Sequence, residues 1–174
     1  MIILALGSNL PSSFGNRIEN INLAIEFLNS FSIKVKKKSS YYETSSYPNK
    51  KDPKFINVVI EVSTKLSPTD LASVTILIEE KLERTRFKKN EPRTCDIDII
   101  DYNSQIINFN YKEFNFIVPH EKLNYRNFVL FPLGEILPNW QHPKTKDLIN
   151  TIIEKLPVEE KNSILKLNKP WYNN

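Results

Sequence analysis

Two aspartates, Asp96 and Asp98, interrupt the otherwise apolar stretch 95–100, where a buried strand would carry only apolar residues. Because successive side chains of a strand point to opposite faces, both aspartates point to the same face, about 7 Å apart. Two like charges on one face repel each other unless they remain in water or share a cation. A Mg²⁺ ion carrying a phosphorylated ligand suits such a pair, because Mg²⁺ prefers carboxylate, water and phosphate oxygens.

An aspartate pair on the solvent face of an edge strand needs no ion, so the pair alone leaves both interpretations open. Basic residues crowd its upstream side, namely Arg84, Arg86, Lys88, Lys89 and Arg93. Carboxylates that hold metal ions and arginines that hold phosphate occur together in phosphoryl transfer. The sequence therefore favours this chemistry around the two aspartates.

Composition excludes several other kinds of site. The chain of 174 residues contains 3 glycines, and neither GxGxxG nor GxxxxGK[ST] occurs, so a glycine-rich phosphate loop is excluded. The single cysteine excludes an internal disulfide framework, and Cys95 lies on the predicted apolar face, where we expect a small core residue rather than a nucleophile. The net charge of +4 is modest and does not resemble a basic nucleic-acid-binding tail.

The segments that must position the aspartates indicate an α+β domain. Up to His120 the predicted order is β-α-β-β-α-β plus a hairpin, which is typical of a ferredoxin-like antiparallel sheet with both helices on one face. The other face is then free to carry Asp96, Asp98 and Asn57. The periodicity predicts strands over 2–6, 33–42, 55–62 and 95–100, a hairpin over 106–109 and 114–118, and helices over 14–31, 67–84, 128–137 and 146–156.

We expect one domain over 1–174, with a core over about 1–157 and a loosely docked polar tail over 158–174. The polar loops 45–53 and 87–91 are predicted lids. The apolar start of the chain is short and lacks a basic leader, and no segment is long enough to cross a bilayer. These observations predict a cytoplasmic monomer with no membrane partner.

Four blocks, taken in order, resemble the 6-hydroxymethyl-7,8-dihydropterin pyrophosphokinase family over the span from Ala5 to about Pro138. The blocks are 6–10, 55–57, 78–86 continuing into 92–98, and 118–120 followed by 126–130. The resemblance implies that diphosphate passes from ATP to the hydroxymethyl group of the pterin, that AMP is released, and that no nucleic acid takes part.

The resemblance also implies a role for each matching residue. Asp96 and Asp98 would hold two Mg²⁺ ions that bridge the ATP phosphates, and Arg84 and Arg93 would clamp the transferred group. The nucleotide-binding positions are Glu79, Arg86, His120 and Arg126. The positions that match the pterin pocket are Asn9, Thr44, Ser45, Ser46, Phe55, Asn57 and Phe128. His120 could instead simply close a turn after Pro119, and Phe128 could be a core residue.

The chain departs from the family's pattern near the arginines. Glu83 occupies a position where the family usually has glycine, and Lys88–Glu91 replace a stretch that usually holds tryptophan and glycine. Without that tryptophan the aromatic lid over the pterin is missing, so we expect a working enzyme that turns over slowly.

Two other functions share some of these features. A Mg²⁺-dependent nucleotidyltransferase would use the same aspartates and arginines, but it would release pyrophosphate and would not need Phe55, Asn57 and Phe128 as a ring pocket. A ferredoxin-like RNA-binding module would suit the isoelectric point of about 9.0. Such a module displays aromatic residues on its central strands, where this chain displays Asp96 and Asp98.

Overall fold

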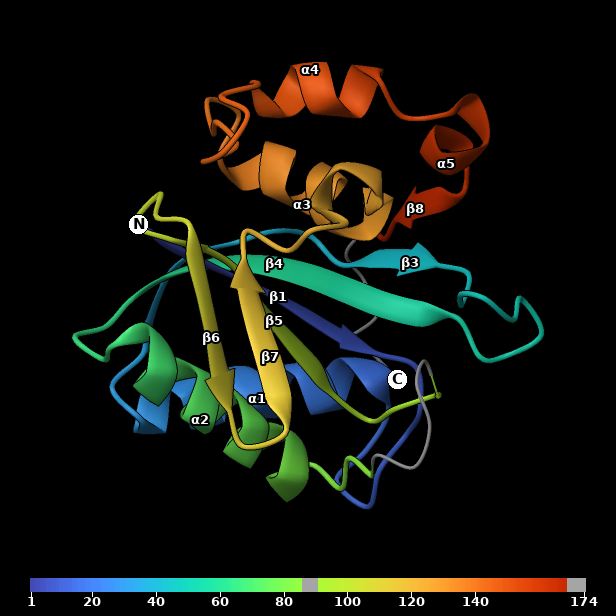
Figure 1. Cartoon of the computed structure of the whole chain (residues 1–174). Helices are drawn as coiled ribbons and strands as arrows, with labels where there is room; N and C mark the ends of the chain where they lie inside the picture. The colour runs from blue at the N-terminus through green and yellow to red at the C-terminus, as the bar shows by residue number, and fades with distance from the viewer. Residues whose placement is uncertain (86–90, 169–174) are drawn as a thin grey trace.

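The computed structural model describes residues 1–85 and 91–168 and contains one six-stranded antiparallel sheet. Strand β1 lies at its centre between β4 and β5, and β4 pairs on its other edge with β2 and β3. Strand β8 continues the sheet beyond β3 (Figure 1). The strands are β1 Ile2–Ser8, β2 Lys34–Lys38, β3 Tyr42–Thr44, β4 Phe55–Ser63, β5 Asp96–Tyr102 and β8 Ile164–Lys166.

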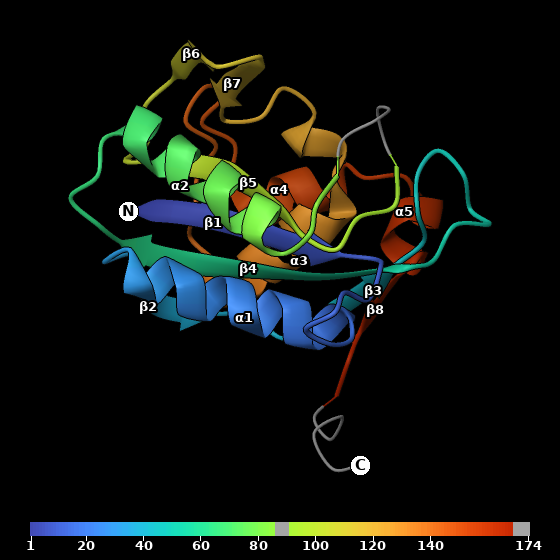
Figure 2. The ribbon, with the colours of Figure 1, turned by 90° about the horizontal axis from the view of Figure 1, so that it is seen from below.

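Two helices cover one face of this sheet, α1 (Arg17–Ser30) and α2 (Pro68–Lys81), as the sequence predicts (Figures 1 and 2). Helix α1 begins with a capping box, in which Asn16 Oδ1 accepts from the Glu19 amide and the Glu19 carboxylate accepts from the Asn16 amide. Helix α2 begins with Ser67 as its N-cap and proline at the next position. The alternate residues Ile56, Val58, Ile60 and Val62 of β4 face this layer.

The opposite face is only partly free, because α3 (Asn127–Ile136) covers much of it and α4 (Ile149–Glu154) packs on α3 (Figure 1). Val59 of β4 and Ile100 of β5 are buried in this second core with Trp140. The strand ends that carry Asp96, Asp98 and Asn57 lie outside this second core. The α+β class is confirmed, and the predicted open face is reduced to one end of the sheet.

The predicted hairpin forms a separate two-stranded sheet of β6 (Ile107–Tyr111) and β7 (Phe114–Val118). The rings of Phe109 and Phe116 stack across the two strands at 5.2 Å between centroids. Contacts of β7 with β5 and of β6 with α2 place the hairpin beside the aspartates.

Three predictions about local structure were wrong. The single strand predicted over 33–42 is divided into β2 and β3, because at Ser39 the regular ladder with β4 is interrupted: the Ser39 amide still donates to the Val59 carbonyl, but the Val59 amide donates to the Ser39 hydroxyl and not to a backbone carbonyl. The helix predicted from residue 146 begins at Ile149, because Lys146 has a φ of 65°, which no right-handed helix contains. Residues 158–168 of the predicted tail are not loosely docked, because they form α5 (Val158–Asn162) and then β8, which pairs with β3. No helix within 1–85 or 91–168 has the length and apolar character to cross a membrane.

Candidate active site

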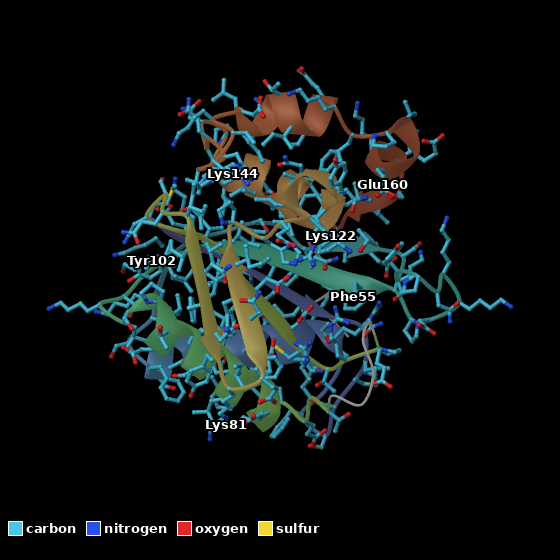
Figure 3. All side chains as sticks on the ribbon, viewed as in Figure 1. Phe55, Lys81, Tyr102, Lys122, Lys144 and Glu160 are labelled. Atoms are coloured by element: carbon cyan, nitrogen blue, oxygen red, sulfur yellow. The ribbon has the colours of Figure 1, made fainter. Side chains whose placement is uncertain are left out.

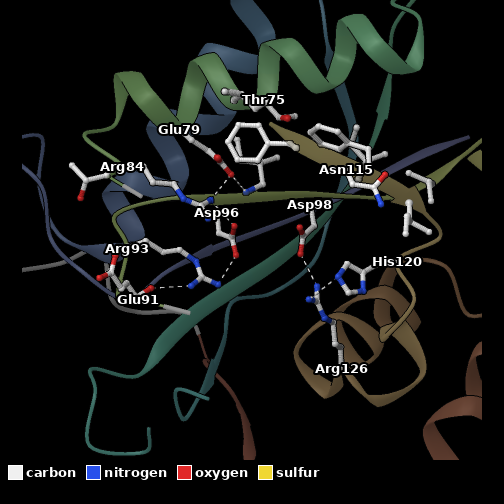
Figure 4. Close-up of a pocket in the computed structure, with 18 residues that line it drawn as sticks. Thr75, Glu79, Arg84, Glu91, Arg93, Asp96, Asp98, Asn115, His120 and Arg126 are labelled. Atoms are coloured by element: carbon white, nitrogen blue, oxygen red, sulfur yellow. Dashed lines mark hydrogen bonds and ion pairs between the residues drawn. The ribbon is translucent and has the colours of Figure 1, made fainter. Parts of the chain in front are cut away.

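A cavity of about 340 Å³ lies between the C-terminal end of α2, strand β5 and the hairpin (Figure 4). Seven of the residues predicted from the sequence line it, namely Glu79, Arg84, Arg93, Asp96, Asp98, His120 and Arg126. Asp96 and Asp98 point to the same side of β5, toward Arg93 and Arg126 (Figure 4). The predicted shared face of the two aspartates is therefore confirmed.

Asp96 is held between two arginines. Arg84 Nη1 donates to Asp96 Oδ1 at 2.5 Å, and Arg93 Nη2 donates to Asp96 Oδ2 at 2.7 Å. Burial alone would raise the pKa of Asp96, but the charges of Arg93 and Arg84 outweigh burial and lower this pKa from 3.8 to about 2. Asp96 is therefore a carboxylate throughout the physiological range.

Asp98 has an arginine partner of its own. Arg126 Nη1 donates to Asp98 Oδ2 at 2.7 Å, and Arg126 Nη2 lies 2.9 Å from His120 Nε2. His120 Nδ1 accepts from the Lys122 amide at 3.0 Å, so both ring nitrogens face N–H donors. Burial, followed by the charge of Arg126, lowers the pKa of His120, which keeps this imidazole neutral near pH 7.

Glu79 lines the cavity but is itself almost completely buried. Its exposed fraction is 3%, and its Oε1 accepts from Arg84 Nη1 at 2.6 Å and from the Ile97 amide at 2.7 Å. Glu79 thereby joins α2 to β5 and fixes the guanidinium of Arg84 beside Asp96. The resemblance predicts a nucleotide-binding residue here, and the structure adds this contact with Arg84.

The arginines retain unused donors that suit an anion. Among the described residues, Arg84 Nε and Arg93 Nε are buried without a hydrogen-bond partner. A buried N–H group without a partner is costly, and a phosphate oxygen would remove that cost. The cavity therefore suits a phosphorylated ligand.

The donor set also fits Mg²⁺. No group of three or more metal-ligating side chains occurs in 1–85 and 91–168, but Mg²⁺ is usually held by one or two carboxylates together with water and substrate phosphates. Asp96 and Asp98 supply two carboxylates on one face, beside donors that suit those phosphates. Both aspartates would exchange an arginine contact for the metal.

A second group of predicted residues surrounds Asn9, which is 1% exposed. Asn9 Nδ2 donates to Ser46 Oγ and to the Pro53 carbonyl, and Asn9 Oδ1 accepts from the Arg93 amide at 2.6 Å. Asn9 therefore joins both ends of the loop 45–53 to Arg93, three residues before the strand that carries the aspartates begins. Ser45, the remaining predicted residue of this loop, is exposed.

Asn57 and Thr44 lie side by side on β4 and β3. Asn57 Nδ2 donates to Thr44 Oγ1 at 3.0 Å, and both side chains are buried. A Cβ atom at Gly7, on the neighbouring strand, would lie 3.2 Å from Asn57 Oδ1 and 3.6 Å from Phe55 Cδ1. Glycine at this position therefore leaves space for the Asn57 amide and the Phe55 ring.

Two arginine–ring contacts connect the second group to the cavity. Arg93 Cζ lies 4.9 Å from the centroid of the Phe55 ring, and Arg126 Cζ lies 5.6 Å from that of Phe128. None of Phe55, Asn57 and Phe128 lines the cavity itself. The second group is thus adjacent to the cavity, with Arg93 over one face of the Phe55 ring and Arg126 over one face of the Phe128 ring.

Arg86 and most of the predicted lid over 87–91 lie outside the described residues.

A sequence model of the family described as 7,8-dihydro-6-hydroxymethylpterin-pyrophosphokinase matches residues 3–138. The chain belongs to this family. The 2-amino-4-hydroxy-6-hydroxymethyldihydropteridine pyrophosphokinase of Bacillus subtilis is 37% identical over 134 residues, covering 76% of this chain and 75% of the relative. The Synechocystis protein of the same name is 32% identical over 155 residues, covering 88% of this chain and 75% of the relative.

Other members of this pyrophosphokinase family are much longer. The Folic acid synthesis protein fol1 of Pneumocystis carinii is 39% identical over 155 residues, which are 89% of this chain and 20% of that protein. The Plasmodium falciparum HPPK-DHPS structure with pteroate matches with a TM-score of 0.70 at 14% identity, covering 88% of this chain and 44% of the other. At this identity the likeness shows the fold alone.

The pyrophosphokinase motifs do not reveal every residue around the cavity. Thr75 and Ile76 of α2 and the β7 residues Phe114–Val118 also line it. The sequence predicts that β6 and β7 form a hairpin, but it does not indicate where that hairpin packs.

The departure at Glu83 has a structural explanation. Helix α2 ends in a Schellman motif, with the Arg84 amide bonded to the Glu79 carbonyl and the Glu83 amide bonded to the Glu80 carbonyl. Glu83 has a φ of 65°, the left-handed conformation that favours glycine. Its carboxylate accepts from the Ser13 amide and the Ser13 hydroxyl, a link that glycine could not make.

Proposed function

We propose that this pyrophosphokinase transfers diphosphate from ATP to 6-hydroxymethyl-7,8-dihydropterin, giving AMP and the pterin diphosphate, in folate biosynthesis. The observation that carries the proposal is the pair Asp96 and Asp98, pointing into one cavity with an arginine bound to each. Membership of the family supports the reaction and both substrates.

The triphosphate of ATP would lie along the arginines. Arg84 and Arg93 would use their free Nε–H groups to hold the transferred diphosphate. Arg126 and His120 would bind the nucleotide on the Asp98 side, and Glu79 would keep Arg84 in place. Arg86 would also bind the nucleotide, as the resemblance to the family implies. Asp96 and Asp98 would hold two Mg²⁺ ions, which would neutralise charge on the β- and γ-phosphates during transfer.

The pterin would lie between the rings of Phe55 and Phe128, because flat heterocycles stack on aromatic faces. Asn57 would bind the amide-like edge of the pterin, with Thr44 holding the Asn57 amide in place. Asn9 and Ser46 would fix the loop 45–53, and Ser45 would meet the pterin through its backbone. Binding of the ring requires Arg93 and Arg126 to leave the ring faces that they cover.

In the reaction the hydroxymethyl oxygen attacks the β-phosphorus, and the bond from that phosphorus to the α,β-bridging oxygen breaks. AMP leaves with the electron pair of this bond, and the hydroxyl proton is released. The arginines stabilise the charge on the departing AMP and on the transferred group.

The experiment incubates the protein with ATP, Mg²⁺ and 6-hydroxymethyl-7,8-dihydropterin and identifies the nucleotide product by chromatography, beside an Asp96→Ala control. Pterin-dependent AMP that disappears in the control supports the proposal. Pyrophosphate in place of AMP would indicate the nucleotidyltransferase, and salt-dependent RNA binding without Mg²⁺ would indicate the RNA-binding module.

We further propose that the fold follows the ferredoxin-like plan, which the strand order β5-β1-β4 and the edge strands β2 and β3 support. The monomeric state, the single domain and the cytoplasmic location stay predictions.

A further inference from the structure

The segment Val158–Leu167 lies outside the family-matched residues 3–138, yet it contacts both sides of the proposed pterin site. Figure 1 shows α5 beside α3, and β8 running from α5 to the edge of β3. Figure 3 labels Glu160 in the segment and Phe55 at the start of β4, and both lie toward the right-hand end of the sheet.

The first contact is with the strand that carries Thr44. Strand β8 pairs with β3 so that Ile164 is opposite Thr44 and Lys166 is opposite Tyr42. The Leu167 amide extends this ladder by donating to the Tyr41 carbonyl at 2.9 Å. Strand β3 is three residues long and pairs with β8 along one edge and with β4 along the other. The position of Thr44 beside Asn57 therefore depends on both neighbours.

Glu135 of α3 strengthens the same junction. Its carboxylate accepts from Tyr42 Oη at 2.9 Å and from the amide and hydroxyl of Ser40, and Lys166 Nζ lies 3.2 Å from Glu135 Oε1. The exposed Lys166 contact contributes little by itself. Together these contacts fix β3 and β8 against the helix that begins beside Phe128.

The second contact is with the start of α3. Asn127 Nδ2 donates to the Glu160 carbonyl at 2.7 Å and to Ser163 Oγ at 2.9 Å. Asn127 is 4% exposed and lies between Arg126 and Phe128 in the chain. The segment that pairs with β3 therefore also holds the turn that presents the Phe128 ring.

We propose that Val158–Leu167 is a clamp that sets the spacing between the two sides of the pterin site, Thr44 and Asn57 on one side and Phe128 on the other. This inference rests on the proposed function. None of the residues 158–167 lines the cavity that contains Asp96, Asp98 and the arginines, so the pairing with β3 acts on the affinity for the pterin and not for the nucleotide, whereas the Asn127 contact also adjoins Arg126 of that cavity. Its members are positioning residues, since they act through β3 and α3.

The test breaks each contact separately in the full chain. Every second amide of β8 faces β3, and the Leu167 amide donates to that side, so the amide of Leu165, two residues earlier, faces β3 as well. Leu165→Pro removes this backbone donor from the ladder. Leu165 is 59% exposed, so little core packing is lost, and Leu165→Ala is the matched control. Asn127→Asp keeps the shape but places a carboxylate against the Glu160 carbonyl. Asn162→Asp makes the same change at an exposed position of the segment.

The measurements are the KM for the pterin, the KM for ATP, and pterin binding by fluorescence in the presence of Mg²⁺ and α,β-methylene-ATP, which cannot transfer diphosphate. We expect Leu165→Pro and Asn127→Asp each to weaken pterin binding about three- to tenfold, the effect of one or two hydrogen bonds. For Leu165→Pro the ATP KM should stay within about twofold, and both controls should match the wild type. Circular dichroism and thermal unfolding identify a variant that does not fold, in which case the other variant decides.

Folded variants whose pterin affinity equals that of the wild type would overturn the clamp. In Leu165→Pro, an ATP KM that rises in step with the pterin KM would also overturn it, because that result indicates general loosening. A wild-type protein that binds pterin without forming AMP would instead contradict the proposed reaction and leave the clamp testable by binding.

Discussion

Glu79 and Arg84 form a buried ion pair, with Arg84 Nη1 2.6 Å from Glu79 Oε1. The Arg84 side chain is 9% exposed and the Glu79 side chain is 4% exposed. The same Arg84 nitrogen donates to Asp96. Glu79 is on α2 and Asp96 on β5, so one guanidinium group joins the helix to the strand that carries the aspartates. The pKa of Arg84 is raised, because Asp96 and Glu79 outweigh the opposing effect of burial.

We expect Glu79→Gln to reduce kcat about tenfold and to lower the free energy of unfolding by about 1–3 kcal/mol, since a buried hydrogen bond to a charged group contributes about that much. Steady-state assays and urea unfolding measure the two effects. Glu80→Gln, the same change at the exposed neighbour, should leave both unaltered. Unchanged kcat in Glu79→Gln, with a raised ATP KM, would favour a role in nucleotide binding alone.

The stability of the protein should depend on the ionisation of Asp96. Its pKa is lowered from 3.8 to about 2 on folding, because Arg93 and Arg84 outweigh burial. A carboxyl whose pKa is lower in the folded state stabilises the fold above its unfolded pKa, and this stabilisation is lost as the pH falls through the folded pKa. We expect about 2 kcal/mol of stability to be present above about pH 5 and lost between about pH 4 and 2.

Urea unfolding of the wild type and Asp96→Asn at several pH values measures this contribution. The difference in unfolding free energy between the two proteins should shrink below about pH 4, where the wild-type carboxyl becomes protonated. A difference that stays constant from pH 7 to about pH 2 would show that Asp96 has no lowered pKa.

Glu83→Gly separates backbone strain from the link to Ser13. Glycine relieves the cost of the left-handed conformation but removes both hydrogen bonds from Ser13. We expect the melting temperature to rise by a few degrees when Glu83→Gly is made in a Ser13→Ala background. In the wild-type background the rise should be smaller. Ser13→Ala removes the hydroxyl bond and leaves the amide bond in place, so equal rises in both backgrounds would mean that the Ser13 hydroxyl bond contributes no stability.

Asp98→Asn should raise the Mg²⁺ concentration needed for half-maximal activity by about tenfold or more, because a neutral amide is a weaker ligand for Mg²⁺. Titration of activity with Mg²⁺ at fixed ATP measures this. Glu121→Gln removes a negative charge from an exposed side chain next to His120, so it is the control for a general change in the electrostatic potential of the site. Identical Mg²⁺ titrations for Asp98→Asn and the wild type would exclude Asp98 as a ligand.

The residues around Asp96 could be predicted because their signals are local. Strand alternation places Asp96 and Asp98 on one face, and the arginines are close to them in the sequence. The predicted start of the second helix at residue 67 is local as well, because Ser67 caps that helix within its first turn. Such features depend on neighbouring residues and not on the tertiary structure.

Features that depend on tertiary contacts could not be predicted. Strand β8 is three residues long and has no strong alternation, and it forms because β3 offers an unpaired edge. The helix predicted over 67–84 includes Glu83, but α2 ends at Lys81 and the left-handed backbone turns the Glu83 side chain to Ser13. The buried contact of Glu79 with the Ile97 amide likewise joins residues from separate elements.

The most direct test of the central claim is ³¹P NMR of the reaction of ATP with 6-hydroxymethyl-7,8-dihydropterin and Mg²⁺. Diphosphate transfer at Asp96 and Asp98 predicts that the β- and γ-phosphorus signals of ATP move together into a pterin-bound diphosphate while AMP accumulates. Asp96→Ala and Asp98→Ala should show neither change. Formation of ADP with a pterin monophosphate, or of free pyrophosphate, would contradict the account, as would undiminished transfer by the two variants.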